Sequence, residues 1–251
     1  TISGLTNGTA YQFRVIAKNA IGSSPVSNIV VATPIIKQNV VWTNLVGVSV
    51  NGNSITKTTA TAWNNSGASS SFKIPADGSV EFTVPQSTNN VMAGLSTTDP
   101  NTSYTSIKFA IYANKGTVGV YESGTSRGSF GTYAAGTTFS VERVGTKINY
   151  KKNGVVFYTS ALTSTGSLLA DAALYTKGVT ISNAKMSGVD PTILAAMSAI
   201  DNYFRILLSG QDPTPARDIM SAAMQAITDP NDQSTIQNYY NQAALTNAKA
   251  A

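Results

Sequence analysis

The sequence predicts a mainly β fold: an antiparallel β-sandwich of the jelly-roll type, preceded by part of another β-sandwich and followed by a small α-helical tail. Short apolar or β-branched runs separated by Gly, Asn, Asp or Pro fill residues 35–189, which is typical of antiparallel sandwiches. After Val189 the apolar residues change to a helical spacing. The net charge changes sign at the same place, from 14 Lys and Arg against 6 Asp and Glu in residues 1–189 to 3 against 6 in residues 190–251. We therefore expect three parts, at 1–34, 35–188 and 189–251.

The composition excludes most common enzyme chemistry. Only 12% of the 251 residues are charged, whereas 80 of the 251 are Thr, Ser or Asn. Cys and His are both absent, which removes disulfides, thiolate nucleophiles, Cys/His zinc sites and His-based catalytic triads. No apolar stretch reaches 18 residues and no signal peptide is visible, so we expect no transmembrane segment and cannot infer secretion from a leader. We predict no catalytic residues and no bound cofactor.

The first part, residues 1–34, is expected to form two strands. Tyr11, Phe13 and Val15 alternate with polar residues, 19–22 supplies a turn, and 29–31 is a second apolar run. The pattern Leu-x5-Tyr ending at Tyr11, followed by Phe-x-Val-x-Ala-x-Asn, resembles the last two strands of a fibronectin type III domain. The resemblance implies a tyrosine corner at Tyr11. Because two strands do not close a core, this segment needs further partners.

Residues 35–188 contain the predicted sandwich. The expected strands are apolar or β-branched runs at 40–42, 46–50, 72–74, 80–84, 107–112, 118–121, 139–144, 148–150, 155–158 and 179–181. Asn153-Gly154 lies between two of these runs and predicts a hairpin, because a type I′ turn needs positive φ at both central residues.

The same block resembles concanavalin A-like (lectin/laminin-G-type) jelly rolls. The resemblance is carried by segments that include Trp42-Thr43-Asn44, 53–57, 63–70, 77–82, 93–96, 109–112, 121–124 and Tyr150 with Asn153-Gly154. Such modules occur beside fibronectin type III domains in bacterial surface proteins and in virion proteins of phages and large DNA viruses. The resemblance implies a two-sheet sandwich used for binding or structure, without a particular ligand.

The tail is expected to form three amphipathic helices. The first helix is predicted to begin at Asp190-Pro191, an N-cap followed by proline, and to end at Gly210. Its apolar residues recur at helical spacing: Ile193, Met197, Ile200, Phe204 and Leu207. The second helix is predicted to begin at Thr214-Pro215 and to end at Asp229-Pro230, and the third to begin near Gln233. Sixty-two residues in short helices can form only a small core. Their apolar faces therefore either pack together or contact a neighbour.

Trp63, Asn64 and Asn65 are the predicted ligand-binding residues. Sugar-binding modules stack pyranose rings on tryptophan, and the polar loop after Trp63 could supply hydrogen bonds beside such a ring. Burial in the core is the alternative for Trp63, and it is the expectation for Trp42, the second tryptophan of the chain.

Two further patterns have a structural alternative. Residues 99–103, Asp-Pro-Asn-Thr-Ser, begin like a calcium loop, but Tyr104 and Ala110 replace the Gly and Glu of an EF-hand, so a turn with capped amides competes with a calcium site. Arg143, Lys147, Lys151 and Lys152 form a basic hairpin, yet their alternation places them on both faces. We expect a solvated hairpin and no specific nucleic acid partner.

A glycosidase would require two nearby carboxylates from the six acids of the sandwich: Asp77, Glu81, Asp99, Glu122, Glu142 and Asp171. The Glu-x-Asp-x-x-Glu pattern of laminarinase-like enzymes is absent. The sequence therefore favours a non-enzymatic structural or binding protein of an exterior surface. The preferred hypothesis is a virion-surface protein (fibre, spike or minor capsid) in an oligomeric assembly, which contacts other structural proteins through 189–251. A bacterial surface adhesin or carbohydrate-binding module is the alternative, and a glycan-cleaving enzyme is the third.

Overall fold

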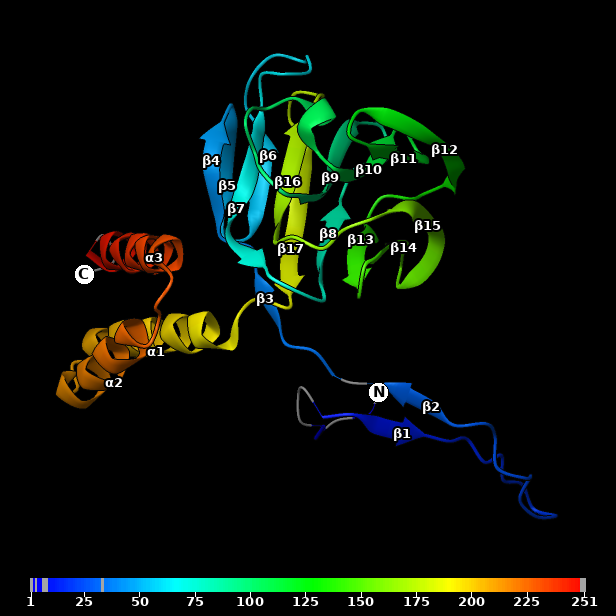
Figure 1. The fold of residues 1–251 in the computed structure, drawn as a ribbon, viewed down its shortest axis with the longest axis horizontal. Coiled ribbons are helices and arrows are strands. Elements are labelled where there is room, and N and C mark those ends of the chain that lie inside the picture. Colours follow the sequence, from blue (N-terminus) through cyan, green and yellow to red (C-terminus); the bar gives the residue numbers. More distant parts are fainter. Residues whose placement is uncertain (1, 3, 6–8, 33, 249–251) are drawn as a thin grey trace. The chain divides into compact units, whose positions relative to one another are not determined.

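The computed structural model describes residues 2, 4–5, 9–32 and 34–248 (Figure 1). The chain divides into two compact units, Thr1–Gln38 and Asn39–Ala251. A short strand, β3 (Lys37–Asn39), spans the division between them.

The first unit is a two-stranded antiparallel hairpin. Strand β1 (Tyr11–Phe13) pairs with β2 (Val30–Ala32), with Tyr11 opposite Ala32. Apolar side chains remain exposed along it, including Val15 (70%) and Val31 (60%). The two strands agree with the expected ones. The resemblance to fibronectin type III domains stays a prediction, because one hairpin does not define a sandwich.

The second unit contains the predicted antiparallel β-sandwich of the jelly-roll type. One sheet is built from β4 (Trp42–Val46), β7 (Gly67–Ile74), β9 (Asn90–Ser96), β10 (Phe109–Asn114), β11 (Thr117–Glu122), β12 (Thr125–Thr132) and β16 (Leu168–Leu174). The other contains β5 (Val48–Asn51), β6 (Ser54–Lys57), β8 (Gly78–Val84), β13 (Thr137–Val144), β14 (Lys147–Lys152), β15 (Val155–Thr163) and β17 (Thr180–Ser187).

The order in the seven-stranded sheet is β12-β11-β10-β9-β16-β7-β4, and in the facing sheet β15-β14-β13-β8-β17-β6-β5. Strands β7, β8 and β9 alternate between the sheets, as do β15, β16 and β17, whereas β9–β12 and β13–β15 each stay within one sheet. Each sheet is therefore assembled from distant parts of the chain.

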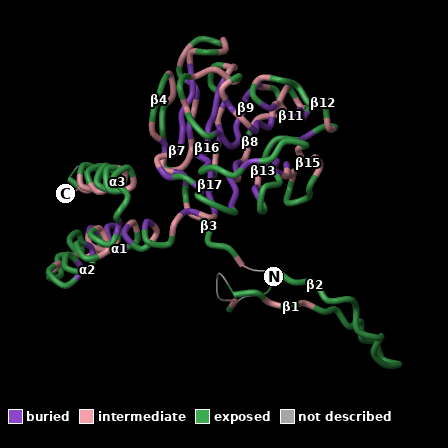
Figure 2. Tube along the Cα trace, viewed as in Figure 1, coloured by how far each residue is buried: buried purple, intermediate pink, exposed green. Residues whose placement is uncertain are grey.

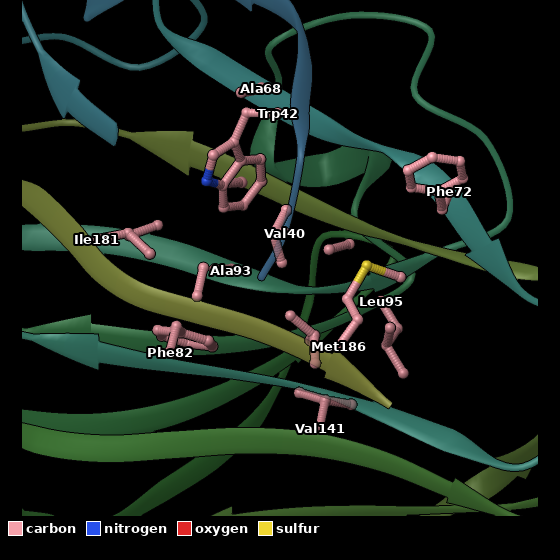
Figure 3. Close-up of a cluster of buried hydrophobic side chains, with 14 of the residues drawn as sticks. Val40, Trp42, Ala68, Phe72, Phe82, Ala93, Leu95, Val141, Ile181 and Met186 are labelled. Carbon is pink, nitrogen blue, oxygen red and sulfur yellow. The ribbon is translucent and has the colours of Figure 1, made fainter. Parts of the chain in front are cut away.

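The hydrophobic core lies between the two sheets (Figure 2). Every second side chain along a strand points inward, because side chains alternate between the two faces of a sheet. Val80 and Phe82 of β8 therefore both point into the core, where they lie opposite Val141 and Phe139 of β13. Trp42 is also buried in this core (Figure 3). Its indole Nε1 donates a 2.9 Å hydrogen bond to the Asn53 carbonyl. The expectation that Trp42 is a core residue is confirmed.

The predicted hairpin at Asn153-Gly154 is confirmed. Strand β14 ends at Lys152, β15 begins at Val155, and the two turn residues have φ values of +49° and +81°. Both positive values are what a type I′ turn requires.

Three helices follow the sandwich: α1 (Pro191–Leu208), α2 (Thr214–Gln225) and α3 (Pro230–Ala248). The Asp190 carboxylate accepts a 2.8 Å hydrogen bond from the Thr192 amide, and Gly210 follows α1 with φ +72°, as the sequence predicts. The predicted role of Asp229-Pro230 is wrong, because Asp229 accepts hydrogen bonds from the amides of Asn231 and Asp232 and so caps the start of α3. None of the described helices is long and apolar enough to cross a membrane.

The helices pack on each other and on the sandwich. Phe204 of α1 lies 5.4 Å from Tyr240 of α3 between ring centroids, and Tyr239 lies 6.4 Å from Phe72 of β7. Ile193 and Ile200 of α1 belong to the same buried cluster as the sheet residues. The apolar faces of the tail are therefore used largely within this chain.

Strands β9 and β16, at the centre of the seven-stranded sheet, are not among the strands that the sequence predicts. Every residue of both is buried. Small residues make this possible, and Gly94 shows why: a methyl group at this position would overlap the Phe109 carbonyl oxygen of the neighbouring strand. The glycine allows the backbones of β9 and β10 to approach.

We expect Gly94→Ala to lower the free energy of unfolding by at least about 2 kcal/mol, because the added methyl group must push two paired strands apart. Chemical denaturation monitored by circular dichroism measures this loss. Gly166→Ala is the matched control, since a methyl group at Gly166 meets no atom within 4 Å. Equal stabilities of the two variants would contradict the close-approach argument.

Candidate functional site

The outer face of the seven-stranded sheet, which points away from the facing sheet, carries a second apolar cluster. Met92, Ala110 and Ala173 are buried there, on strands β9, β10 and β16. Their neighbours on each strand point into the main core, because side chains alternate between the faces of a sheet. Half-buried aromatic rings pack over this outer cluster.

Five rings form what we call the aromatic cluster: Trp63, Tyr104, Tyr112, Tyr121 and Tyr175. The Trp63 ring centroid lies 5.0 Å from that of Tyr104, 5.9 Å from that of Tyr112 and 5.1 Å from that of Tyr175. Tyr121 extends the cluster, with its ring 5.5 Å from Tyr112 and 6.1 Å from Tyr104. Each ring comes from a different segment: the loop between β6 and β7, the 3-10 turn Tyr104–Ser106, β10, β11 and the residue that follows β16.

The tyrosine hydroxyls make this apolar surface partly polar. The Tyr112 hydroxyl accepts a 3.0 Å hydrogen bond from Asn90 Nδ2, and burial, followed by the nearby Tyr121, Tyr175 and Tyr104, raises the pKa of Tyr112. In the described part of the chain, the hydroxyls of Tyr104, Tyr121 and Tyr175 make no hydrogen bond. They are free to donate to a ligand.

Asn90 leaves a buried polar atom without a partner in this cluster. Its side-chain oxygen Oδ1 makes no hydrogen bond, although the residue is only 9% exposed. Its backbone is held on the other side, where the Asn90 amide donates to the Thr176 hydroxyl and its carbonyl accepts from the Tyr175 amide at 3.2 Å. An unpaired buried polar atom costs about 1–3 kcal/mol, so Asn90 Oδ1 lowers the stability of the folded state at this point.

The side chains of the three predicted ligand-binding residues, Trp63, Asn64 and Asn65, lie in different surroundings. Trp63 stands at the centre of the aromatic cluster and is half-buried. Asn64 is exposed and adopts φ +66°. Asn65 points into the protein, where its Nδ2 donates to the Ala60 carbonyl at 3.1 Å and its Oδ1 accepts from the Lys57 ammonium. Its side chain is thus engaged within the loop.

The loop at Asp99 has the geometry of a turn with capped amides. The Asn101 side chain accepts a 2.8 Å hydrogen bond from the Ser103 amide, and the Ser103 hydroxyl accepts from the Thr105 amide. Asp99 Oδ2 accepts from Asn44 Nδ2 at 3.4 Å. No group of three or more acidic residues arranged for a metal occurs among the described residues. Because calcium takes six to eight oxygen ligands, these contacts favour the turn, and calcium stays a prediction that chelation can test.

No protein-family model matches the chain, and no curated protein matches it in sequence. Among solved structures, it is similar to the PSpry domain of TRIM65, with 10% identity and a TM-score of 0.46 over 57% of this chain and 90% of that one. A human SPRY domain is similar to it with 12% identity and a TM-score of 0.43, over 55% of this chain and 95% of that one. The Ca²⁺-bound exoplasmic/lumenal domain of VIP36 is similar with 8% identity and a TM-score of 0.43, over 59% of this chain and 84% of that one. At these values no residue role is transferred, and the fold assignment rests on the strand order.

The four cations of the predicted basic hairpin do not form one surface. Arg143 is 1% exposed and donates to backbone carbonyls, including Ala76 from Nε at 2.7 Å. Lys151 pairs with Glu142 at 2.6 Å, and Lys152 donates to the Thr132 carbonyl at 2.8 Å. The expected solvated hairpin is wrong for Arg143, which is buried because its guanidinium donates to backbone carbonyls, whereas Lys147, Lys151 and Lys152 remain at least partly exposed.

Two acids of the sandwich are buried. Glu122 accepts hydrogen bonds from Arg127 Nε at 2.7 Å and from the Tyr150 hydroxyl at 3.0 Å, so both carboxylate oxygens are engaged. Asp171 is 3% exposed and accepts a 2.8 Å hydrogen bond from the Ser96 hydroxyl. Burial, followed by the neighbouring charge of Asp99, raises the pKa of Asp171 from 3.8 to about 7.

The raised pKa of Asp171 predicts a pH-dependent stability. The folded protein binds more protons than the unfolded chain between about pH 4 and pH 7, so the free energy of unfolding falls by roughly 3 kcal/mol as the pH rises through this window. Asp171→Asn removes this titration and should flatten the profile, leaving the variant more stable than the parent at pH 8. Denaturant unfolding at several pH values measures it, with the exposed Asp218→Asn as the control. An unchanged slope in Asp171→Asn would contradict the assignment.

Proposed function

We propose that this chain is a non-enzymatic binding protein of an exterior surface, and that it holds a neutral glycan on the aromatic cluster. The observation that carries the proposal is the group of five half-buried aromatic rings, in which the hydroxyls of Tyr104, Tyr121 and Tyr175 make no hydrogen bond within the described part of the chain. The Tyr112 hydroxyl, which already accepts from Asn90, has its own proton to donate. A sugar hydroxyl can accept this proton.

The surrounding rings supply the remaining chemistry of a sugar site. Pyranose rings carry apolar C–H faces next to hydroxyls, and ligand sites typically combine an apolar lining with a few placed polar groups. Trp63 and Tyr121 offer ring surface, while the hydroxyls of Tyr104 and Tyr175 are unbonded. All the side chains in this set are uncharged at neutral pH, which favours a neutral glycan over an acidic one.

We expect Tyr112→Phe to weaken glycan binding about tenfold, which corresponds to about 1.4 kcal/mol, because it removes one hydrogen-bond donor and the acceptor of the Asn90 amide. A neutral-glycan array identifies the ligand, and calorimetry measures its affinity. Trp63→Ala should abolish binding, whereas Trp63→Phe should retain part of it, since it keeps an aromatic face. Tyr158→Phe, in a separate ring group with Phe130 and Tyr150, is the matched control.

Three outcomes would count against the proposal. Binding that survives Trp63→Ala and Tyr112→Phe would place the glycan elsewhere. Binding lost to Tyr158→Phe as well would indicate general damage. Affinity that disappears in EDTA and returns with calcium would assign the recognition to a metal rather than to the neutral side chains.

The virion-surface role belongs to this proposal as the setting in which the module acts, with a bacterial cell surface as the alternative. Exposed apolar residues of α1 and α2, Leu207, Leu208 and Ile219, support contact with another structural protein of such an assembly. Because the helices also cover the core of their own sandwich, truncation at Gly188 would damage the fold. Replacing these three side chains by Ser is the cleaner test, and unchanged assembly on the particle would exclude the anchoring role.

The absence of catalysis is also proposed. Both oxygens of Glu122 are engaged, and Asp171 is only 3% exposed, which supports a role without catalysis. Release of reducing ends from the bound glycan, lost on substitution of Asp99 or of one of Glu81, Glu122 and Glu142, would overturn it.

A further inference from the structure

Lys57, at the end of β6, is a buried cation that the proposed function does not use. The residue is 2% exposed, and its ammonium Nζ donates to the carbonyls of Ala62 at 3.0 Å and Leu174 at 2.9 Å. It also donates to the Ser66 hydroxyl at 2.9 Å and to Asn65 Oδ1. Four oxygen atoms therefore converge on three N–H groups.

All four oxygens are uncharged, and no carboxylate pairs with Lys57 among the described residues. Burial lowers the pKa of this ammonium below its usual 10.5. A cation in this position is costly unless its hydrogen bonds are satisfied. The local backbone must therefore keep its carbonyls directed at Nζ, and Lys57 constrains the segments to which they belong.

Those segments are the two that carry Trp63 and Tyr175. Ala62 directly precedes Trp63, and Leu174 directly precedes Tyr175. The backbone joins them as well, because the Ala62 amide donates to the Tyr175 carbonyl at 3.1 Å and the Leu174 amide donates to the Ser66 carbonyl at 3.0 Å. The Trp63 and Tyr175 rings meet 5.1 Å apart above this junction.

We propose that Lys57 is the positioning residue of the aromatic cluster, in which its ammonium fastens the loop of Trp63 to the end of β16 and thereby sets Trp63 against Tyr175. The inference about loop order stands on the contacts above. Its consequence for glycan binding rests on the proposed function.

Arg143 provides a matched comparison within the same chain. It is equally buried, and its partners among the described residues are the backbone carbonyls of Ile74, Ala76 and Gly166. None of these carbonyls belongs to a segment that carries a ring of the cluster. Removing Arg143 should therefore destabilise the protein without moving Trp63.

The test uses the fluorescence of Trp63 in the full chain carrying Trp42→Phe, which leaves Trp63 as the single tryptophan. We expect Lys57→Met to shift the emission to longer wavelength and to increase acrylamide quenching under conditions where circular dichroism shows a folded sandwich. Lys57→Gln, which keeps two N–H donors on a shorter side chain, is the milder variant if Lys57→Met does not fold. Arg143→Met should leave emission and quenching unchanged.

Chemical rescue separates the ammonium from general packing. Lys57→Ala removes the atoms that n-propylammonium contains, so this cation should restore the Trp63 emission of Lys57→Ala, whereas n-propanol at the same concentration should not. Glycan affinity, once a ligand is identified, should fall about tenfold in Lys57→Met, which corresponds to about 1.4 kcal/mol, because Trp63 is then no longer held against Tyr175.

The outcomes distinguish the two proposals. Folded Lys57→Met or Lys57→Gln with unchanged Trp63 emission and quenching would overturn the positioning role. A change of equal size in Arg143→Met would do the same, since it would reveal an unspecific effect of losing a buried cation. If the parent protein binds no glycan but the Lys57 variants alter Trp63, the proposed function fails and the positioning role stands.

Discussion

The burial of strands β9 and β16 on both faces is the constraint on which much of this structure depends. Their inner faces lie against the facing sheet, as in any sandwich. Their outer faces are equally buried, so the chain must cover them with its loops. The loop with Trp63 and the turn with Tyr104 provide this cover, and aromatic side chains are suited to it because each buries a large apolar area. The candidate site is a consequence of this cover.

Buried cations hold the loops in place. A chain without cysteine has no disulfides, and few ion pairs join the segments that the structure describes. Lys57 and Arg143 each hold backbone carbonyls around their own charged group instead: those of Ala62 and Leu174 around Lys57, and those of Ile74 and Ala76 around Arg143. Such a contact is specific, because a buried ammonium or guanidinium tolerates little loss of its partners. It also explains why two of the most buried large side chains in this protein are cationic.

Local patterns were sufficient where the structure depends on near neighbours. The caps at Asp190 and Gly210 and the turn at Asn153-Gly154 follow from backbone geometry that a few residues decide. Strands β9 and β16 escaped prediction because their Ala- and Gly-containing runs have neither alternation nor high β-propensity. Asp229 was placed at the wrong end of a helix, since an Asp-Pro pair can follow one helix or begin the next.

The sequence by itself determined the jelly-roll sandwich, its helical tail and the tryptophan around which a site could form, because these depend on periodicity, turns and residue type. Only the tertiary structure decided which residues join Trp63. Trp63 and Tyr175 lie far in the chain from Tyr104, Tyr112 and Tyr121, and the strand order brings them together. Asn65, adjacent to the site in sequence, turns inward to Lys57. Strand pairing between distant segments has no signature in any single stretch of sequence, so the composition of the site could not be read in advance.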